Sequence, residues 1–94
     1  MQISEFQRLI EAIYFARDSA RGRDRTFLWF VEEVGELARA MTRPRDGRNL
    51  REEFADVLAW LATLASIEGI SLDDAAAEKY GKGCPKCGGT PCRC

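Results

Sequence analysis

The chain has 94 residues, of which 46% are hydrophobic and 31% are charged, a balance typical of one globular domain and not of a disordered segment. Its 14 basic and 15 acidic residues leave a net charge of −1, so the broad basic surface of a nucleic-acid-binding protein is not expected. The absence of His excludes the usual general base and the Ser–His nucleophile. Any catalysis must therefore use carboxylates, Lys, Cys or a metal ion.

Neither a membrane span nor a signal peptide is expected. No apolar run approaches the ~18 residues that a spanning helix needs. The first five residues lack the basic and then apolar layout of a signal peptide. We therefore expect a cytoplasmic protein without membrane contact.

The first predicted helix runs from a Ser4 cap to about Ser19. Its apolar residues recur at spacings of three and four, which is the helical period. A polar connector containing a glycine is expected over residues 20–25.

A second helix is predicted to begin at Asp24 or Thr26, either of which could act as its cap. It must end near Thr42 or the residue after it, because the proline at position 44 disfavours helical backbone just before it. Residues 44–48 are then expected to form a turn.

A third helix is expected to start at Asn49, because Glu52 follows it at the spacing of a capping box. Gly69 should end this helix. A short fourth helix should start at Ser71 and end near Tyr80.

No alternating β-branched run occurs, so the predicted fold is all-α. The short connection at 44–48 makes the second and third helices antiparallel, giving a helical hairpin core with two flanking helices. Residues 1–80 are predicted to form this domain. Residues 81–94 contain glycine, proline and cysteine without apolar periodicity, and we expect them to form a separate tail.

A duplicated acidic motif is the most informative feature of the sequence. Six of the seven positions of residues 31–37 match residues 51–57 in chemical type. Acids spaced three apart project from one helix face about one turn apart. Each copy carries such a pair beside the apolar stripe of its helix: Glu33 and Glu36 in the first, Glu53 and Asp56 in the second.

Folding the hairpin brings these four acids to one level, because the two pairs lie at similar distances from the turn. Carboxylates that converge in this way repel one another unless a cation compensates them. A hard divalent ion such as Mg²⁺ suits this oxygen-only set. The alternative is a solvated acidic face. The duplication and the neighbouring Trp29 and Trp60, which are costly to expose, favour the metal site.

The pair Glu32-Glu33-x-x-Glu36 and Glu53-x-x-Asp56 resembles the signature of the MazG family of all-α nucleoside triphosphate pyrophosphohydrolases, and the likeness runs over residues 6–79. The resemblance implies hydrolysis of (deoxy)nucleoside triphosphates to the monophosphate and pyrophosphate, with Mg²⁺ or Mn²⁺ as cofactor. House-cleaning of the nucleotide pool is the role we expect.

The resemblance also assigns roles to individual side chains. Where the family commonly continues with Asn and Arg residues, this chain has Gly81-Lys82-Gly83-Cys84. Lys79, and Lys82 just after it, would lie near the phosphates, and Glu32 would orient or activate the attacking water. The implied metal ligands are Glu33, Glu36, Glu53 and Asp56.

The two tryptophans predict an oligomer. Trp29 and Trp60 lie beside the core stripe of a chain too short to cover both faces of its hairpin. Pairing two hairpins into a four-helix bundle would cover them, in a homodimer or homotetramer. Trp29 could also stack on a nucleobase, as could Tyr14 and Phe15, although each alone fits a core or interface position.

Eleven of the 14 basic residues are arginines, and most gather near the two connectors. The arginine fork suits phosphate oxygens. For any single arginine, however, solvation or pairing with Asp18, Asp24 or Asp46 is the favoured interpretation.

All four cysteines lie in the tail, at Cys84, Cys87, Cys92 and Cys94. Cys-Pro-x-Cys-Gly is typical of a zinc knuckle, and four thiolates suit a structural Zn²⁺. The tight Cys92-x-Cys94 spacing argues against it. Disulfides, disfavoured in a reducing compartment, and a disordered reduced tail are the alternatives.

Three functions remain open on the sequence alone. The first is the Mg²⁺-dependent pyrophosphohydrolase. The second is a zinc-knuckle adaptor whose helices only dimerise. The inward carboxylates argue against this function, because a dimerising helix does not need them and they repel nucleic acid. The third is a catalytically silent regulatory subunit, which an activity assay would distinguish from the first.

Overall fold

The computed structural model describes residues 1–43 and 47–94, which form four helices and no strand within those ranges. This confirms the predicted all-α fold class. The helices in chain order are α1 (Ile3–Arg21), α2 (Arg23–Thr42), α3 (Gly47–Ile67) and α4 (Leu72–Tyr80).

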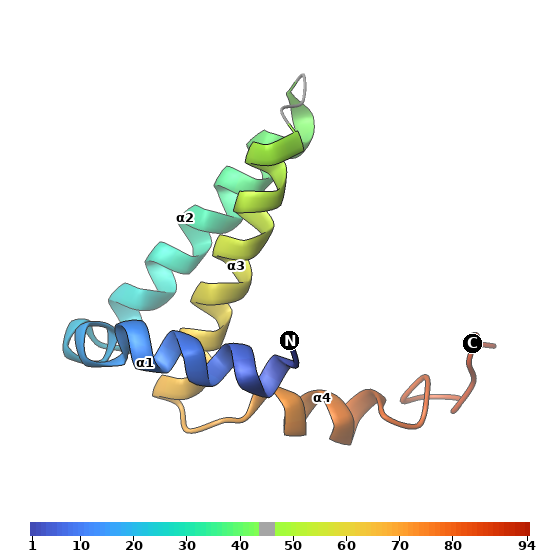
Figure 1. Ribbon diagram of the computed structural model, residues 1–94. Helices are drawn as coiled ribbons and strands as arrows, with labels where there is room; N and C mark the ends of the chain where they lie inside the picture. Colours follow the sequence, from blue (N-terminus) through green and yellow to red (C-terminus); the bar gives the residue numbers. More distant parts are fainter. Residues whose placement is uncertain (44–46) are drawn as a thin grey trace.

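The hairpin expected from the sequence is present. Helices α2 and α3 lie side by side along their length, and α1 crosses the end of the hairpin opposite the α2–α3 connection (Figure 1). Helix α4 leads away from this end of the hairpin, and the tail continues beyond α4. The hairpin with two flanking helices is therefore confirmed within one chain, and its pairing into a four-helix bundle stays a prediction.

Helix α1 begins two residues earlier than a Ser4 cap predicts. Gln2 is the N-cap, and its backbone N–H donates to Oε1 of Glu5 at 3.2 Å. Glu5 thus satisfies the amide of the N-cap residue, and Ser4 lies within the first turn of the helix.

The expected polar connector over residues 20–25 is wrong: Gly22 alone separates α1 from α2. Gly22 has φ +91°, a conformation that other residues rarely adopt, and it turns the chain within one residue. Neither Asp24 nor Thr26 caps α2. Thr26 is fully buried inside the first turn, where its hydroxyl donates to the Gly22 carbonyl at 2.7 Å.

The end of α2 at Thr42 is confirmed. The predicted turn over 44–48 lies partly outside the described residues, and its last two residues already belong to α3. Asn49 is therefore inside the helix and is not its cap. An ion pair between Arg48 and Glu52, with N···O 3.3 Å, supports this extra first turn.

The predicted boundaries between α3 and α4 are confirmed. Gly69 follows the end of α3, and the N–H of Ile70 reaches back to the carbonyl of Ala65 at 2.8 Å. Ser71 then caps α4 by accepting from the N–H of Asp74 at 3.2 Å.

A buried glutamine joins α1 to the segment between α3 and α4. Gln7 is 6% exposed, and its amide nitrogen donates to Ser66 Oγ at 3.0 Å and to the Ile70 carbonyl at 2.8 Å. Its amide oxygen accepts from the N–H of Leu72 at 2.9 Å. These satisfied bonds avoid the cost of a buried unpaired amide and fix where α1 crosses the hairpin.

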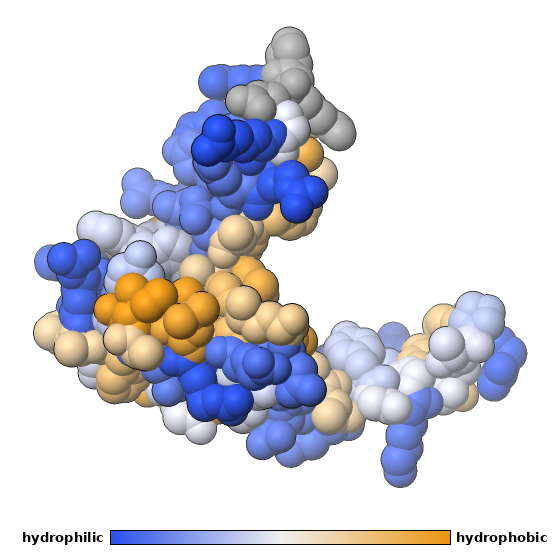
Figure 2. All heavy atoms as spheres, in the orientation of Figure 1, coloured by the Kyte–Doolittle hydropathy of each residue, from blue (hydrophilic) through white to orange (hydrophobic). Residues whose placement is uncertain are grey.

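The apolar stripes predicted as core are only partly covered in one chain. Among the described residues, the buried hydrophobic side chains are Ile10, Ala62 and Ala65. Figure 2 shows apolar atoms over α1 and along the side of the hairpin that is turned toward α1. Stripe residues of α2 and α3 that are more than 40% exposed include Val34, Met41 and Phe54.

No single helix in the described part of the chain is long and apolar enough to span a membrane. Helices α3 and α4 meet that test only as a pair, which is bent by 96° at the break between them.

We predict that a second chain covers the exposed stripes. Sedimentation at micromolar concentration should show a dimer or tetramer, because burying apolar surface favours association. Phe54→Asp should shift the distribution toward monomer, since it places a charge on a stripe side chain that is 53% exposed. Arg25→Asp, on the exposed side of α2 opposite Val34, is the matched control and should leave the distribution unchanged. A folded wild-type monomer would contradict this prediction.

Candidate functional site

Three of the four predicted ligand carboxylates meet at the middle of the hairpin. Glu33 comes from α2, and Glu53 and Asp56 come from the facing side of α3. Their nearest carboxylate oxygens all lie within 4.8 Å of one another. We call these three residues the acidic cluster. Because Glu53 and Asp56 are three apart, one helix face presents both to α2.

The fourth expected ligand, Glu36, points elsewhere. Its carboxylate forms an ion pair with Arg39, three residues further along α2. The charge of Glu36 nevertheless helps to raise the pKa values of both Glu33 and Glu53, so it lies near the cluster. Glu32, beside Glu33 on α2, is exposed.

The acidic cluster is electrostatically strained. Partial burial is the main cause that raises the pKa of Glu33 above its ordinary value, and repulsion from Asp56 and Glu53 adds to it. The pKa of Glu53 is raised by the same two effects. Within the described residues, Oε2 of Glu53 is buried without a hydrogen-bond partner. A buried acceptor without a donor, among like charges, suits a cation.

Asp56 also borders a cavity of about 210 Å³ between α1 and the hairpin. The cavity therefore adjoins the acidic cluster through a shared carboxylate. Its other polar and aromatic lining residues include Tyr14, Arg17, Asp18, Arg21, Trp29, Trp60 and Thr63.

Two tryptophan rings and one guanidinium form a wall of this cavity. The ring centroids of Trp29 and Trp60 are 5.7 Å apart, with the planes tilted by 57°. The guanidinium carbon of Arg21 lies 4.8 Å from the centroid of Trp29 and 5.1 Å from that of Trp60. Cation–π attraction at these distances holds both rings in place.

Buried Asp18 fixes that arginine. Its side chain pairs with Arg21 at 3.1 Å and accepts a hydrogen bond from the hydroxyl of Thr63 on α3 at 2.9 Å. Asp18 is 4% exposed, so its charge is compensated by both partners. The predicted pairing of arginines with Asp18 and Asp24 is thus confirmed, the second through Arg23 at 3.5 Å, although both arginines lie at helix ends and not in a loop. Asp46 lies outside the described residues.

The sequence alone predicts no ligand-binding role for Trp60, Arg21 or Asp18. The spacing of Asp18 and Arg21, three apart near a helix end, is a signal for their ion pair. Nothing local in the sequence indicates that this pair lies over Trp60, which is far along the chain.

Lys79 and Lys82 are not brought to the acidic cluster within one chain. Helix α4 and the tail extend away from the hairpin (Figure 1). The ammonium of Lys79 lies 5.6 Å from the ring centroid of its neighbour Tyr80.

The four tail cysteines form a second group of potential metal ligands. Their sulfur atoms lie within 4.8 Å of one another. Backbone N–H groups of Arg93 and Gly89 lower the pKa of Cys87 to about 6, and those of Cys87 and Lys86 lower the pKa of Cys84. Hydrogen bonding among the thiols raises the pKa of Cys94.

Comparison with known proteins identifies one family. The family model described as the MazG nucleotide pyrophosphohydrolase domain matches residues 21–88, well over half of the chain. The match spans the hairpin, α4 and the first two tail cysteines. No curated protein matches the chain.

The strain in the acidic cluster predicts a pH-dependent effect of removing one charge. Without metal, Glu53→Gln should raise the melting temperature at neutral pH, because it removes a charge that is partly buried and repelled by its neighbours. A raised carboxyl pKa means that the folded state binds protons more tightly than the unfolded state, so wild-type stability falls as pH rises through the raised pKa. The advantage of the variant should therefore shrink as pH falls toward 4.5, the ordinary carboxyl value.

Glu52→Gln is the matched control for this measurement. The charge of Glu52 also helps to raise the pKa of Glu53, but Glu52 is exposed and pairs with Arg48, so its removal should stabilise the protein much less than Glu53→Gln does. Thermal unfolding followed by circular dichroism across this pH range checks both variants. If Glu53→Gln changed the melting temperature by the same amount at all pH values, the predicted repulsion in the acidic cluster would be contradicted.

Proposed function

Because the chain belongs to the MazG nucleotide pyrophosphohydrolase family, we propose that it hydrolyses (deoxy)nucleoside triphosphates to the monophosphate and pyrophosphate, using Mg²⁺ or Mn²⁺ at the acidic cluster. The observation that carries this proposal is the position of Asp56. It belongs both to the acidic cluster and to the lining of the cavity that contains Trp29 and Trp60, which we call the aromatic cavity. A site for a cation and a site for a flat ring thus share one carboxylate.

The donor set fits a hard divalent cation. Glu33, Glu53 and Asp56 offer only oxygen ligands, and the unpartnered Oε2 of Glu53 is an acceptor that a cation would satisfy. Glu36 would become a fourth ligand by leaving its ion pair with Arg39. When bound, the cation would neutralise charge on the phosphate oxygens and lower the pKa of a bound water.

Glu32 is assigned to orienting the attacking water. It is exposed to solvent beside Glu33, and its charge contributes to the raised pKa of Glu33. A carboxylate at this position can accept a hydrogen bond from water without occupying the metal site. This chemistry depends on charge neutralisation and positioning, so it needs no His.

The aromatic cavity is the proposed site for the nucleobase. Its volume of about 210 Å³ is below the ~300–1,000 Å³ typical of sites that enclose a whole drug-sized ligand, so it suits one flat ring. Trp29 and Trp60 offer faces for stacking. The triphosphate would then extend past Asp56 toward the acidic cluster.

Oligomerisation would complete the site. Lys79 and Lys82 lie on α4 and just beyond it, away from the hairpin of their own chain. We assign them to phosphates bound at the hairpin of a neighbouring chain, in a homodimer or homotetramer.

A catalytically silent regulatory subunit is the second candidate function. The ion pair between Glu36 and Arg39 favours it, because this pairing leaves three converging carboxylates in place of four. Pyrophosphate release from canonical and modified (deoxy)nucleoside triphosphates with Mg²⁺ separates the two candidates. Turnover of any of them supports the enzyme.

Removing a ligand charge should abolish most of this turnover. Asp56→Asn and Glu36→Gln should each lower kcat by about 100-fold or more, because each weakens the cation site. Glu52→Gln, on the same helix as Asp56 but outside the cluster, should retain activity. Near-wild-type pyrophosphate release from Asp56→Asn would refute the site, provided that circular dichroism shows all variants to be folded.

Intrinsic fluorescence should report nucleotide binding directly. Both tryptophans of the protein line the cavity, so the whole tryptophan signal comes from the proposed base site. Titration with a non-hydrolysable nucleoside triphosphate and Mg²⁺ should change the emission of Trp29→Phe and of Trp60→Phe, each of which keeps one reporter. Inorganic triphosphate is the control without a base and should change it much less. Equal responses to both ligands would place the base elsewhere.

A further inference from the structure

The four cysteines of the tail converge on one point. Their Sγ···Sγ separations are 3.6 Å between Cys84 and Cys92, 3.8 Å between Cys84 and Cys94, and 4.0 Å between Cys87 and Cys92. Sulfurs about 2.3 Å from a Zn²⁺ ion at the corners of a tetrahedron lie about 3.8 Å apart. The observed separations are those of four ligands around one ion.

Disulfides do not account for this arrangement. A disulfide needs two sulfurs about 2.05 Å apart, and all four cysteines are free. Cys84 and Cys87 are each close to sulfurs of the 92–94 segment, so the four thiols form one group and do not divide into two pairs.

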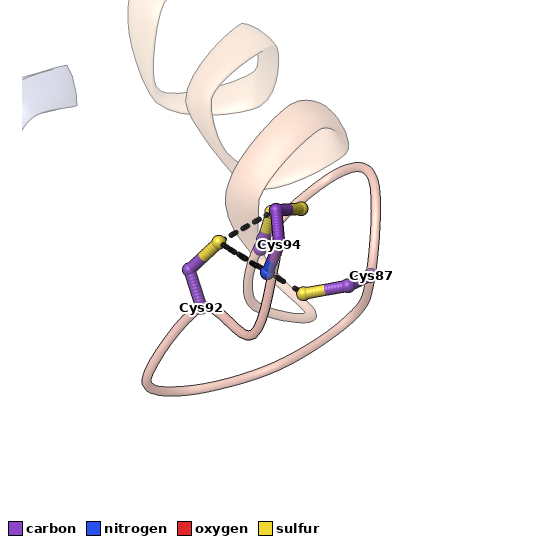
Figure 3. A group of neighbouring side chains, drawn as sticks. Cys87, Cys92 and Cys94 are labelled. Atoms are coloured by element: carbon purple, nitrogen blue, oxygen red, sulfur yellow. Dashed lines mark hydrogen bonds between the residues drawn. The ribbon is translucent and has the colours of Figure 1, made fainter.

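The backbone around the sulfurs is arranged to support negative charge on them. The N–H groups of Gly89 and Arg93 both donate to Cys87 Sγ, at 3.4 and 3.2 Å. The N–H of Cys94 donates to Cys92 Sγ at 3.3 Å. Figure 3 shows Cys87, Cys92 and Cys94 pointing toward one another from a loop that turns back on itself. Such bonds stabilise thiolates, which are the form that binds a metal.

The loop itself is closed by close backbone contacts. The N–H of Cys84 donates to the Gly89 carbonyl at 3.0 Å, and the N–H of Gly88 donates to the Cys84 carbonyl at 2.7 Å. A Cβ at Gly83 would lie 2.8 Å from the carbonyl oxygen of Gly88, so only glycine fits there. The tight Cys92-x-Cys94 spacing is thus compatible with convergence, because the loop brings both sulfurs to the same centre.

The tail lacks a hydrophobic core that could hold this conformation. Residues 81–94 form no helix or strand, and the buried residue among them is Gly89. Ordering such a segment costs about 1–2 kcal/mol per residue in backbone entropy. An unpaired cluster of thiolates would add repulsion to that cost. A bound metal ion offsets both.

We propose that Cys84, Cys87, Cys92 and Cys94 bind one structural Zn²⁺ ion. Each thiol releases its proton to solvent as its sulfur coordinates the metal. Four protein ligands close the tetrahedral shell, so the site has no position for water or substrate and serves to order the tail. This site is separate from the acidic cluster, whose ligands are all oxygen atoms.

Metal analysis and cobalt spectroscopy of the full chain test the proposal. Reduced protein reconstituted with Zn²⁺ and desalted should hold about one Zn²⁺ per chain, the stoichiometry of a four-thiolate site. Co²⁺ in its place should give the visible absorption of a tetrahedral site and a sulfur-to-cobalt charge-transfer band. Cys87→Ser and Cys94→Ser should each lose the charge-transfer intensity and retain much less metal after desalting.

Two matched controls locate the metal. Lys86→Ala lies between two of the ligands but keeps every sulfur, so it should bind like wild type. Glu53→Gln alters the acidic cluster, whose ligands are oxygen atoms, and should leave the sulfur-to-cobalt charge-transfer band unchanged. Absence of metal in reduced wild-type protein would overturn the proposal. So would a cobalt spectrum that lacks thiolate bands, or a native mass lowered by a pair of hydrogens for each disulfide.

Discussion

Repulsion among carboxylates at the middle of the hairpin is the constraint on which the functional interpretation depends. Glu33, Glu53 and Asp56 share one small volume, and partial burial together with this repulsion raises the pKa values of Glu33 and Glu53. Packing of α2 against α3 holds them there. A protein that keeps like charges together at a cost to its own stability retains a ready site for a cation, and the proposed chemistry uses that site.

The buried ion pair of Asp18 and Arg21 extends this site toward α1. Asp18 accepts from Thr63 on α3, while Arg21 lies over both tryptophan rings. One charged residue of α1 thereby sets the position of a neighbouring helix and the shape of the cavity beside Asp56. Removal of Asp18 would leave a buried guanidinium without its anion, so the aromatic wall depends on this pair as much as on apolar packing.

Two parts of the single chain are incomplete in different ways. The hairpin leaves apolar side chains such as Val34 and Phe54 exposed, which a second chain would cover. The tail has converging thiols such as Cys84 and Cys87 but no hydrophobic core, and a bound metal ion would stabilise its conformation instead. Both deficits would be met by components from outside the chain, and the functional assembly that we propose is therefore an oligomer with two kinds of metal site.

The sequence by itself determined the all-α class, the stop of α3 before Gly69 and the capping of α4 by Ser71, and it indicated most of the acids and all of the cysteines that converge. These features are local: helix stop signals and three-residue spacings act within a few positions of the chain. Only the tertiary structure decided that Glu36 turns to Arg39, that the helical stripes stay half-exposed, and that Asp18 completes the wall of the cavity. A helical period identifies which side chains share a face, but what covers that face, and which way a long side chain turns, depends on contacts between residues far apart in the chain.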